Sequence, residues 1–491
     1  MKKCFNRNKT YAAAIIGILL VTLFCGCGEQ AATDTPALTP GSTTLWEGRL
    51  EADKFPLHFY LQTHTDGKQP KMSVTASRPG WAGPVDHLKL SGNQLSFRIS
   101  TRNVSFSGTI ASDAITGVWN EEPYISWWLT MNSVATPAFM FTKQHPWPPF
   151  PYLVEEVTIP GTENRPLLAG TITRPSEPGS YTAILLLNGQ HAQGRDSECY
   201  FHRPFLVWAD HLTRNGMVVL RCDDRGVGGS EGIFNEATTA DFATDASACI
   251  DFLNRRPEIS RVGIFGHSEG GLVAAMVASE CRNVDFLVLL APPVFPISRI
   301  WEQQSPSINR RKGTNERQAE LRRKLEAEAW QKLAAIAGGK ADKAVFRKFY
   351  TSFLAGLTEE DRVMLGFPSS EKGRIGVERQ LQEWCSPWML FMAVFDPAAS
   401  YRGISCPVLG VFAGLDENVL PEPNAAELEK HLRASQCPSF KIHTFPDFDH
   451  QMRRPVKYAS ATYPLAETVA TETLKLVTDW IKLQSQTTAP R

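Results

Sequence analysis

The chain has 491 residues, of which 43% are hydrophobic and 21% are charged. This composition is ordinary for a globular protein with a large core, and the length predicts two or three domains. Lys plus Arg and Asp plus Glu both number 51, so the formal net charge is zero. That balance excludes a general electrostatic attraction to nucleic acid or to an anionic membrane, and we expect no nucleic-acid partner.

Residues 1–27 have the features of a bacterial lipoprotein signal peptide. A positively charged start precedes the apolar run Ala12–Phe24, which is too short for a stable membrane span. Gly26 before Cys27 suits cleavage and lipidation at Cys27, whereas Cys25 follows a bulky residue and suits them less well. We therefore expect an exported protein, anchored by lipid in the bacterial cell envelope, at the periplasm or the cell surface. The alternative is an ordinary secretory signal peptide.

A tether and an all-β domain are predicted next. Residues 28–44 are rich in Thr, Pro, Ala and Gly, which is typical of a flexible linker. Within residues 45–143, stretches such as Leu57–Leu61 and Leu95–Ile99 alternate apolar and polar residues between short turns. This pattern predicts a small antiparallel sandwich or barrel. Its tryptophans, which admit stacking on sugar rings but more often form a core, are Trp46, Trp81, Trp119, Trp127 and Trp128.

The cysteines give no sign of a metal site. Seven follow the signal segment, an odd number, so at least one is free or pairs outside the chain. No Cys-x-x-Cys pair occurs after residue 27. We expect neither a metal nor an organic cofactor.

The pattern changes after a proline-dense linker, His145–Pro151. Between residues 150 and 485, continuous apolar runs such as Ala183–Leu187 and Val262–Phe265 alternate with helical segments. Apolar runs without alternation indicate strands covered on both faces, so this region predicts an α/β domain with a mostly parallel sheet. Residues 296–396 interrupt it with helical sequence, which we interpret as a lid. Candidates to line a pocket beneath it are Trp384, Trp388, Met389 and Phe391.

A Gly-x-Ser-x-Gly pentapeptide, Gly266–Gly270, lies between a short buried strand and a helix of small residues. A serine on a sharp strand-to-helix turn presents an exposed hydroxyl, and the flanking glycines avoid collisions in that turn. Ser268 is therefore the candidate nucleophile. The alternative is a glycine-rich connection whose serine only caps the helix.

A serine nucleophile needs a base and an acid that orients the base. Asp416 follows an apolar strand, and His450 follows the next strand, which places both at the edge of the sheet where this chemistry is built. We predict His450 as the base and Asp416 as the acid. The competing acids are Asp396, Asp447 and Asp449, of which the last two are close enough to His450 in sequence to shape its loop instead.

Two backbone N–H groups are predicted to stabilise the negative oxygen of the tetrahedral intermediate. One belongs to Glu269, directly after the nucleophile, and the other to Gln190, with His191 as the second choice. The Glu269 carboxylate is expected to be held away from that oxygen, and we assign it no chemical role.

These motifs resemble the α/β-hydrolase superfamily, in particular exported esterase or serine-aminopeptidase-like hydrolases with an N-terminal β-domain. The resemblance covers residues 150–485 and depends on Arg221–Ser230, the 266–271 turn, Asp416 and His450. It implies that Asp224 and Arg225 make loop hydrogen bonds. Relatives often carry Gly-Ser-Gly-Pro-Gln at the oxyanion loop, where this chain has Gly-Gln-His-Ala-Gln and His191 fills a glycine position.

The sequence thus predicts a serine hydrolase that cleaves carboxylic esters of small molecules through Ser268, His450 and Asp416. One alternative is a serine aminopeptidase with the same triad. Another is a non-catalytic surface protein that binds glycans on a hydrolase scaffold.

Overall fold

The computed structural model describes residues 43–50, 57–65, 70–76, 83–99, 104–111, 113–121, 125–133, 144–198, 202–281, 283–455 and 467–486. The predicted signal segment, the lipidation site at Cys27 and nearly all of the predicted tether lie outside these residues. In the described part of the chain, no helix is long and apolar enough to cross a membrane.

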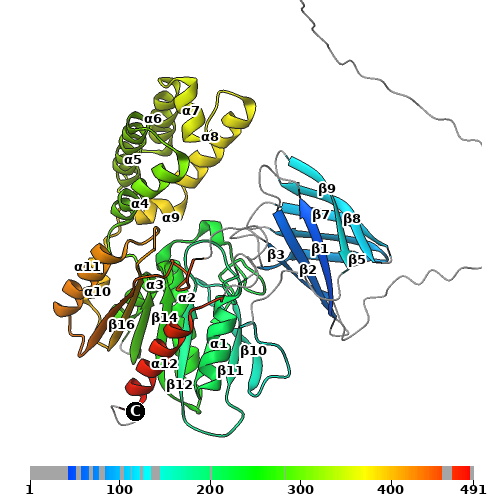
Figure 1. Cartoon of the computed structure of the whole chain (residues 1–491), viewed down its shortest axis with the longest axis vertical. Helices are drawn as coiled ribbons and strands as arrows, with labels where there is room; N and C mark the ends of the chain where they lie inside the picture. The colour runs from blue at the N-terminus through cyan, green and yellow to red at the C-terminus, as the bar shows by residue number, and fades with distance from the viewer. Residues whose placement is uncertain are drawn as a thin grey trace, which may run out of the picture.

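The N-terminal domain is a single antiparallel sheet of nine strands with the order β4-β3-β2-β1-β9-β8-β7-β6-β5 (Figure 1). Only Val85 separates β4 from β5, and β4 pairs with β3 while β5 pairs with β6. The two ends of the sheet therefore meet in one stretch of chain, and the sheet curls into a barrel. The strands are β1 (Thr43–Leu50), β2 (Leu57–Thr65), β3 (Pro70–Ala76), β4 (Gly83–Pro84), β5 (Asp86–Ser91), β6 (Gln94–Ile99), β7 (Val104–Ala111), β8 (Ala114–Glu121) and β9 (Ile125–Ser133).

Aromatic residues fill this barrel. Phe97 stacks on Phe106 with ring centroids 5.2 Å apart, and the edge of Trp119 meets Phe97. Trp46 and Trp119 are buried, which makes them core residues, whereas Trp128 is 81% exposed. Trp81 and the side chain of Trp127 lie outside the described residues.

The C-terminal domain is built on a mixed sheet of eight strands with the order β10-β11-β13-β12-β14-β15-β16-β17. The first two strands form an antiparallel hairpin, and β11 also pairs antiparallel with β13. From β13 to β17 in this order, neighbouring strands run parallel. The strands are β10 (Leu153–Ile159), β11 (Leu168–Arg174), β12 (Tyr181–Leu187), β13 (Val218–Cys222), β14 (Ile259–His267), β15 (Phe286–Leu290), β16 (Val408–Ala413) and β17 (Phe440–Phe445).

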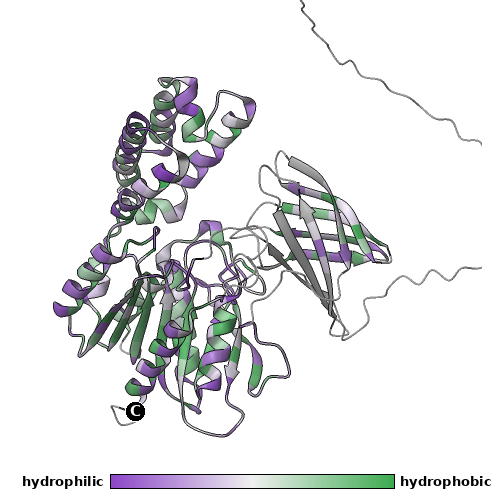
Figure 2. Cartoon of the chain, in the orientation of Figure 1, coloured by the Kyte–Doolittle hydropathy of each residue, from purple (hydrophilic) through white to green (hydrophobic). Residues whose placement is uncertain are grey.

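Helices cover both faces of this sheet, as the apolar strands predicted. Alternate strand residues such as Ile184 and Leu185 belong to two different hydrophobic clusters, one on each face. Figure 2 shows hydrophobic residues gathered on the central strands and hydrophilic residues on the outer faces of the helices. One face is covered by α1 (Pro204–Arg214) and α12 (Thr471–Gln486), and the other by α2 (Thr239–Asn254), α3 (Glu269–Glu280), α10 (Ala398–Arg402) and α11 (Pro421–Arg433).

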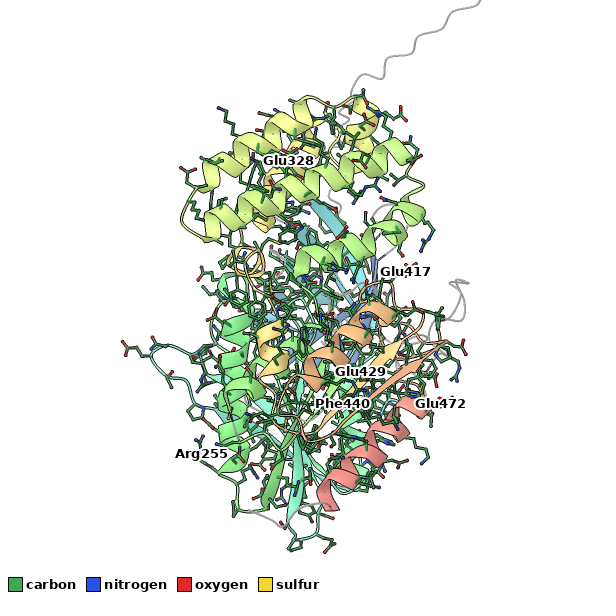
Figure 3. The ribbon with its side chains drawn as sticks, turned by 90° about the vertical axis from the view of Figure 1, so that its left-hand side faces the viewer. Arg255, Glu328, Glu417, Glu429, Phe440 and Glu472 are labelled. Carbon is green, nitrogen blue, oxygen red and sulfur yellow. The ribbon has the colours of Figure 1, made fainter. Side chains whose placement is uncertain are left out.

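The insertion after β15 forms a separate helical layer, which we call the lid. It lies beyond one end of the sheet, as the labelled position of Glu328 on α5 shows (Figure 3). Its core is a cluster of Trp301, Trp330 and Trp384, whose ring centroids lie 5.1 to 5.4 Å apart. The lid helices are α4 (Ile297–Lys312), α5 (Glu316–Ala337), α6 (Lys343–Ala355), α7 (Glu359–Leu365), α8 (Glu371–Trp384) and α9 (Pro387–Met392).

The six described cysteines after the signal segment are all free thiols: Cys222, Cys249, Cys281, Cys385, Cys406 and Cys437. Cys199 lies outside the described residues. In the same described part of the chain, no group of three His, Cys, Asp or Glu side chains is arranged to hold a metal ion.

Candidate active site

Ser268 occupies a strained turn between β14 and α3. Its φ of 55° and ψ of −121° fall where side chains with a Cβ are rarely found. The turn is tied to the sheet because the Ser268 N–H donates to the Leu290 carbonyl of β15 at 2.8 Å. The side chain is half-buried and does not cap α3. Ser268 therefore presents its hydroxyl at the end of the central strand instead of using it to begin the helix.

The flanking glycines allow this turn to pack tightly. A Cβ at Gly266 would lie 2.2 Å from the Gly270 carbonyl oxygen, and a Cβ at Gly270 would lie 2.3 Å from the Leu187 carbonyl oxygen. Both partners are backbone atoms of the sheet and the turn, which cannot move aside cheaply. The two glycines are thus required by contact and not by their own φ.

We expect Gly270→Ala to lower the free energy of unfolding by about 1–3 kcal/mol, the usual cost of overpacking a core. Gly356→Ala is the matched control, because its Cβ would meet only ordinary contacts at 3.5 Å or more. Urea denaturation of both variants measures the difference. Equal midpoints for the two variants would contradict this explanation of the turn.

Asp416 and His450 meet at the same edge of the sheet. Asp416 comes three residues after β16 ends, and His450 five residues after β17 ends. The Asp416 Oδ2 and His450 Nδ1 atoms are 2.7 Å apart, and the Asp416 side chain is fully buried. Asp416 Oδ1 accepts hydrogen bonds from the N–H groups of Asn418 and Val419 at 2.7 and 2.9 Å. The carboxylate is thereby fixed on both oxygens.

This contact decides the proton arrangement of His450. When Nδ1–H donates to Asp416, the Nε2 lone pair is left free to accept a proton. Burial alone would lower the pKa of His450, but the charge and hydrogen bond of Asp416, with the charge of Asp449, outweigh burial and raise it. The pair has the electrostatics of an oriented general base.

His267, the residue before Ser268, touches His450 directly. Its Nε2 donates to the His450 carbonyl oxygen at 2.8 Å, and the two ring centroids lie 4.8 Å apart. Burial, with the nearby charge of His450, lowers the pKa of His267 to about 4, so this ring is neutral at pH 7. The contact places the His450 loop against the turn that carries Ser268. The Ser268 hydroxyl has no hydrogen-bond partner in the described part of the chain.

The loop after β12 passes beside Ser268. A Cβ at Gly189 would lie 3.2 Å from the Cβ of Ser268. The side-chain amide of Gln193 donates to the carbonyls of Gly189 and Gln190 at 3.2 and 3.1 Å. Because a trans peptide points its C=O and N–H in opposite directions, the Gln190 N–H faces away from Gln193. Neither that N–H nor the Glu269 N–H has a partner among the residues that the structure describes.

Asp224 holds this loop at both ends. Its Oδ1 accepts from Asn188 Nδ2 at 3.1 Å, and its Oδ2 accepts from the Gln193 N–H at 2.9 Å. Burial raises the pKa of Asp224 to about 8 although both hydrogen bonds act in the opposite sense. Between these ends, His191 has a φ of 79°, the left-handed conformation that glycine prefers. The histidine at a glycine position is thus accommodated with a strained backbone.

A cleft of about 1280 Å³ separates this loop from the lid. Its lining includes Gln190, His191 and Glu269 on the sheet domain and Trp388 and Met389 on α9. Two of the four predicted lining residues are therefore in place. Trp384 is not, because it is 4% exposed within the tryptophan cluster of the lid, and Phe391 does not border this cleft.

Residues 201–355 match the family Hydrolase_4, described as serine aminopeptidase, S33. Esterase EstD of Thermotoga maritima is 27% identical over 150 residues, which are 30% of this chain and 35% of EstD. The uncharacterized protein RP471 of Rickettsia prowazekii is 26% identical over 145 residues, 29% of this chain and 58% of that protein. The matched segments thus span from a third to just over half of these relatives.

The esterase Pf2001 of Pyrococcus furiosus has a similar solved structure, with a TM-score of 0.42 and 17% identity over 72% of this chain and all of Pf2001. The order of the eight-stranded sheet, with Ser268 turning from its central strand β14 into α3, agrees with the family match. The C-terminal domain has the α/β-hydrolase fold. An antiparallel β-domain precedes it, as the sequence predicted.

Two functional contacts of the hydrolase domain were not predicted. One is the support of His450 by His267, for which the only signal was the position of His267 beside Ser268. The other is the Glu269 carboxylate, which accepts hydrogen bonds from Thr239 and Trp388 at 2.7 Å each. No sequence signal connects Trp388 with Glu269, because they are 119 residues apart.

Proposed function

We propose that this α/β-hydrolase cleaves carboxylic esters with Ser268 as nucleophile, His450 as general base and Asp416 as the orienting acid. The observation that supports the proposal most is the Asp416–His450 pair, whose histidine contacts His267 on the turn that carries Ser268 at positive φ. A strained serine and an oriented imidazole at the same edge of the sheet are the groups that nucleophilic acyl transfer requires.

In the proposed first half-reaction, Ser268 Oγ attacks the ester carbonyl carbon while its proton passes to His450 Nε2. Asp416 stabilises the imidazolium, and the N–H groups of Glu269 and Gln190 donate to the oxyanion. The intermediate collapses, the alkoxide leaves with the proton from His450, and an acyl-enzyme remains. Water then attacks the acyl group with His450 again as base, which releases the acid and restores Ser268.

A substrate panel tests the ester assignment. Comparing p-nitrophenyl acetate with aminoacyl p-nitroanilides should show turnover of the ester and little of the anilides. Faster cleavage of the anilides would favour a serine aminopeptidase, the second candidate, which the description of the matched family supports. No cleavage of either class would favour a binding protein on this scaffold.

The pH profile should report His450. Because only the neutral imidazole accepts the Ser268 proton, kcat/KM rises with pH through the pKa of His450 in the free enzyme. The Asp416 charge holds that pKa above its ordinary value of 6.5, so we expect the midpoint of the acid limb above 6.5. Stopped-flow or steady-state rates between pH 4 and 9 measure it, and a midpoint below 6.5 would contradict the Asp416–His450 pairing.

We also propose that the protein is exported and anchored by lipid at Cys27. The support is the sequence alone, where a small residue precedes Cys27 at the end of an apolar run. Radiolabelled palmitate should be incorporated by the full chain and by Cys25→Ser but not by Cys27→Ser. Unchanged membrane association of Cys27→Ser would contradict the proposal.

A further inference from the structure

Glu269 joins three segments of the hydrolase domain at one carboxylate oxygen. Its Oε1 accepts from Thr239 Oγ1 and from Trp388 Nε1, each at 2.7 Å. Thr239 is the first residue of α2, Trp388 belongs to α9 of the lid, and Glu269 begins α3 directly after Ser268. The lid is thus bonded to the residue that follows the proposed nucleophile.

The two hydrogen bonds stabilise a Glu269 carboxylate that is buried. Its side chain is only 8% exposed, and no lysine or arginine in the described part of the chain pairs with it. A buried carboxylate without a cation is stabilised chiefly by the hydrogen bonds it accepts. Burial raises the pKa of Glu269, and the bonds from Trp388 and Thr239 oppose that shift only in part. Removing either donor therefore leaves a poorly compensated group beside Ser268.

The short helix α9 connects the Glu269–Trp388 hydrogen bond with the wall of the substrate cleft. It packs on α5 and α8 of the lid and on α2 of the sheet domain. Trp388 and Met389 line the cleft together with Glu269, and the Met392 sulfur lies 3.5 Å from Thr239 Oγ1. The position of α9 thus sets the cleft wall that lies beside Glu269, the residue that follows Ser268 in the chain.

We propose that Glu269 is a positioning residue that fixes Trp388 as one wall of the cleft and thereby determines which esters are accepted by size. The inference rests on the proposed ester hydrolysis. A bulky aromatic acyl group reaches the Trp388 wall, whereas an acetyl group does not extend that far. Release of the wall therefore weakens binding of the bulky ester more than that of the acetate.

Trp388→Phe tests this, because it keeps a ring and removes only the N–H donor. We expect the ratio of kcat/KM for p-nitrophenyl benzoate to that for p-nitrophenyl acetate to fall about tenfold, mainly through KM of the benzoate. Trp330→Phe is the matched control, since the buried Trp330 N–H in the lid core has no hydrogen-bond partner among the residues that the structure describes. The benzoate-to-acetate ratio of kcat/KM in Trp330→Phe should equal that of the wild type.

Variants of Thr239 and Glu269 distinguish the loss of a hydrogen bond from the loss of side-chain volume. Thr239→Val should shift the ratio in the same direction, and its control Thr244→Val should not. In the described part of the chain, the Thr244 hydroxyl bonds only to the Ala240 carbonyl of its own helix. Glu269→Gln keeps a carbonyl oxygen for both donors and should retain the ratio that Glu269→Ala loses. A ratio that Glu269→Ala and Trp388→Phe both leave unchanged would overturn the inference.

Hydrogen exchange gives a readout that needs no substrate. Amides of residues 388–393 should exchange faster in Trp388→Phe and Glu269→Ala than in the wild type or Trp330→Phe. If the wild type hydrolyses no ester, the proposed function fails and exchange alone decides the inference. Unchanged exchange in these variants would then overturn it.

Discussion

Replacing Ser268 by alanine is expected to lower kcat for ester hydrolysis by on the order of 10⁶-fold, the loss seen when a serine nucleophile is removed from a working triad. The acyl-enzyme cannot form without Oγ, so only transition-state binding by the oxyanion donors remains. The fold should persist, because the Ser268 hydroxyl makes no cap to α3 and the turn is held by the Ser268 backbone N–H to Leu290. Initial rates with p-nitrophenyl acetate measure the effect.

Ser279→Ala is the matched control for that experiment. Ser279 lies on the same helix α3, and among the described residues its hydroxyl bonds only to the Met276 carbonyl of its own helix. Its rate should stay close to that of the wild type, with an unchanged circular dichroism spectrum for both variants. Residual activity of Ser268→Ala above one percent would show that another residue supplies the nucleophile.

Asp416→Asn has the second largest expected effect, a loss of about 10⁴-fold in kcat. An asparagine at this site accepts the N–H groups of Asn418 and Val419 on its carbonyl oxygen and turns its NH₂ toward His450. His450 Nδ1 must then accept a hydrogen bond, so the proton moves to Nε2 and the base is lost. The acid limb of kcat/KM should also move to lower pH, because the charge that raises the pKa of His450 is gone.

Asp396→Asn controls for the choice of acid. Asp396 was a competing candidate, but it is exposed and its Oδ1 accepts from the Ala398 N–H at the start of α10, a bond that asparagine can also accept. We expect nearly wild-type rates. A large loss in Asp396→Asn together with a small one in Asp416→Asn would reverse the assignment of the acid.

The sequence predicted the elements that depend on local pattern. The mostly parallel sheet was predicted from continuous apolar runs, which indicate strands covered on both faces. Ser268, Asp416 and His450 were predicted as site residues because each follows a predicted strand. Parallel strands align their carboxyl ends, so position along the chain was sufficient to bring Asp416 and His450 to one edge. The helices between β15 and β16 were predicted from the helical sequence of residues 296–396, and their role as a lid stays a prediction.

Contacts between distant segments were not predictable in this way. The choice between a sandwich and a barrel stayed open, because closure depends on β4 and β5, which end the sheet on opposite sides and are joined at Val85. Trp384 was predicted to line the pocket but lies in the lid core. Helical spacing alone does not show which face of a lid helix points toward the cleft. Glu269 was assigned no role because its partner Trp388 comes from the far end of the insertion, and no sequence pattern connects the two residues.

Covalent labelling tests directly whether Ser268 is the nucleophile. The full chain is treated with a fluorophosphonate, which reacts with activated serines, and the modified residue is identified by peptide mass spectrometry. We expect a single adduct, on the peptide that contains Ser268. It should form in the wild type and in Ser279→Ala and be absent from Ser268→Ala. An adduct on another residue, or one that persists in Ser268→Ala, would contradict this expectation.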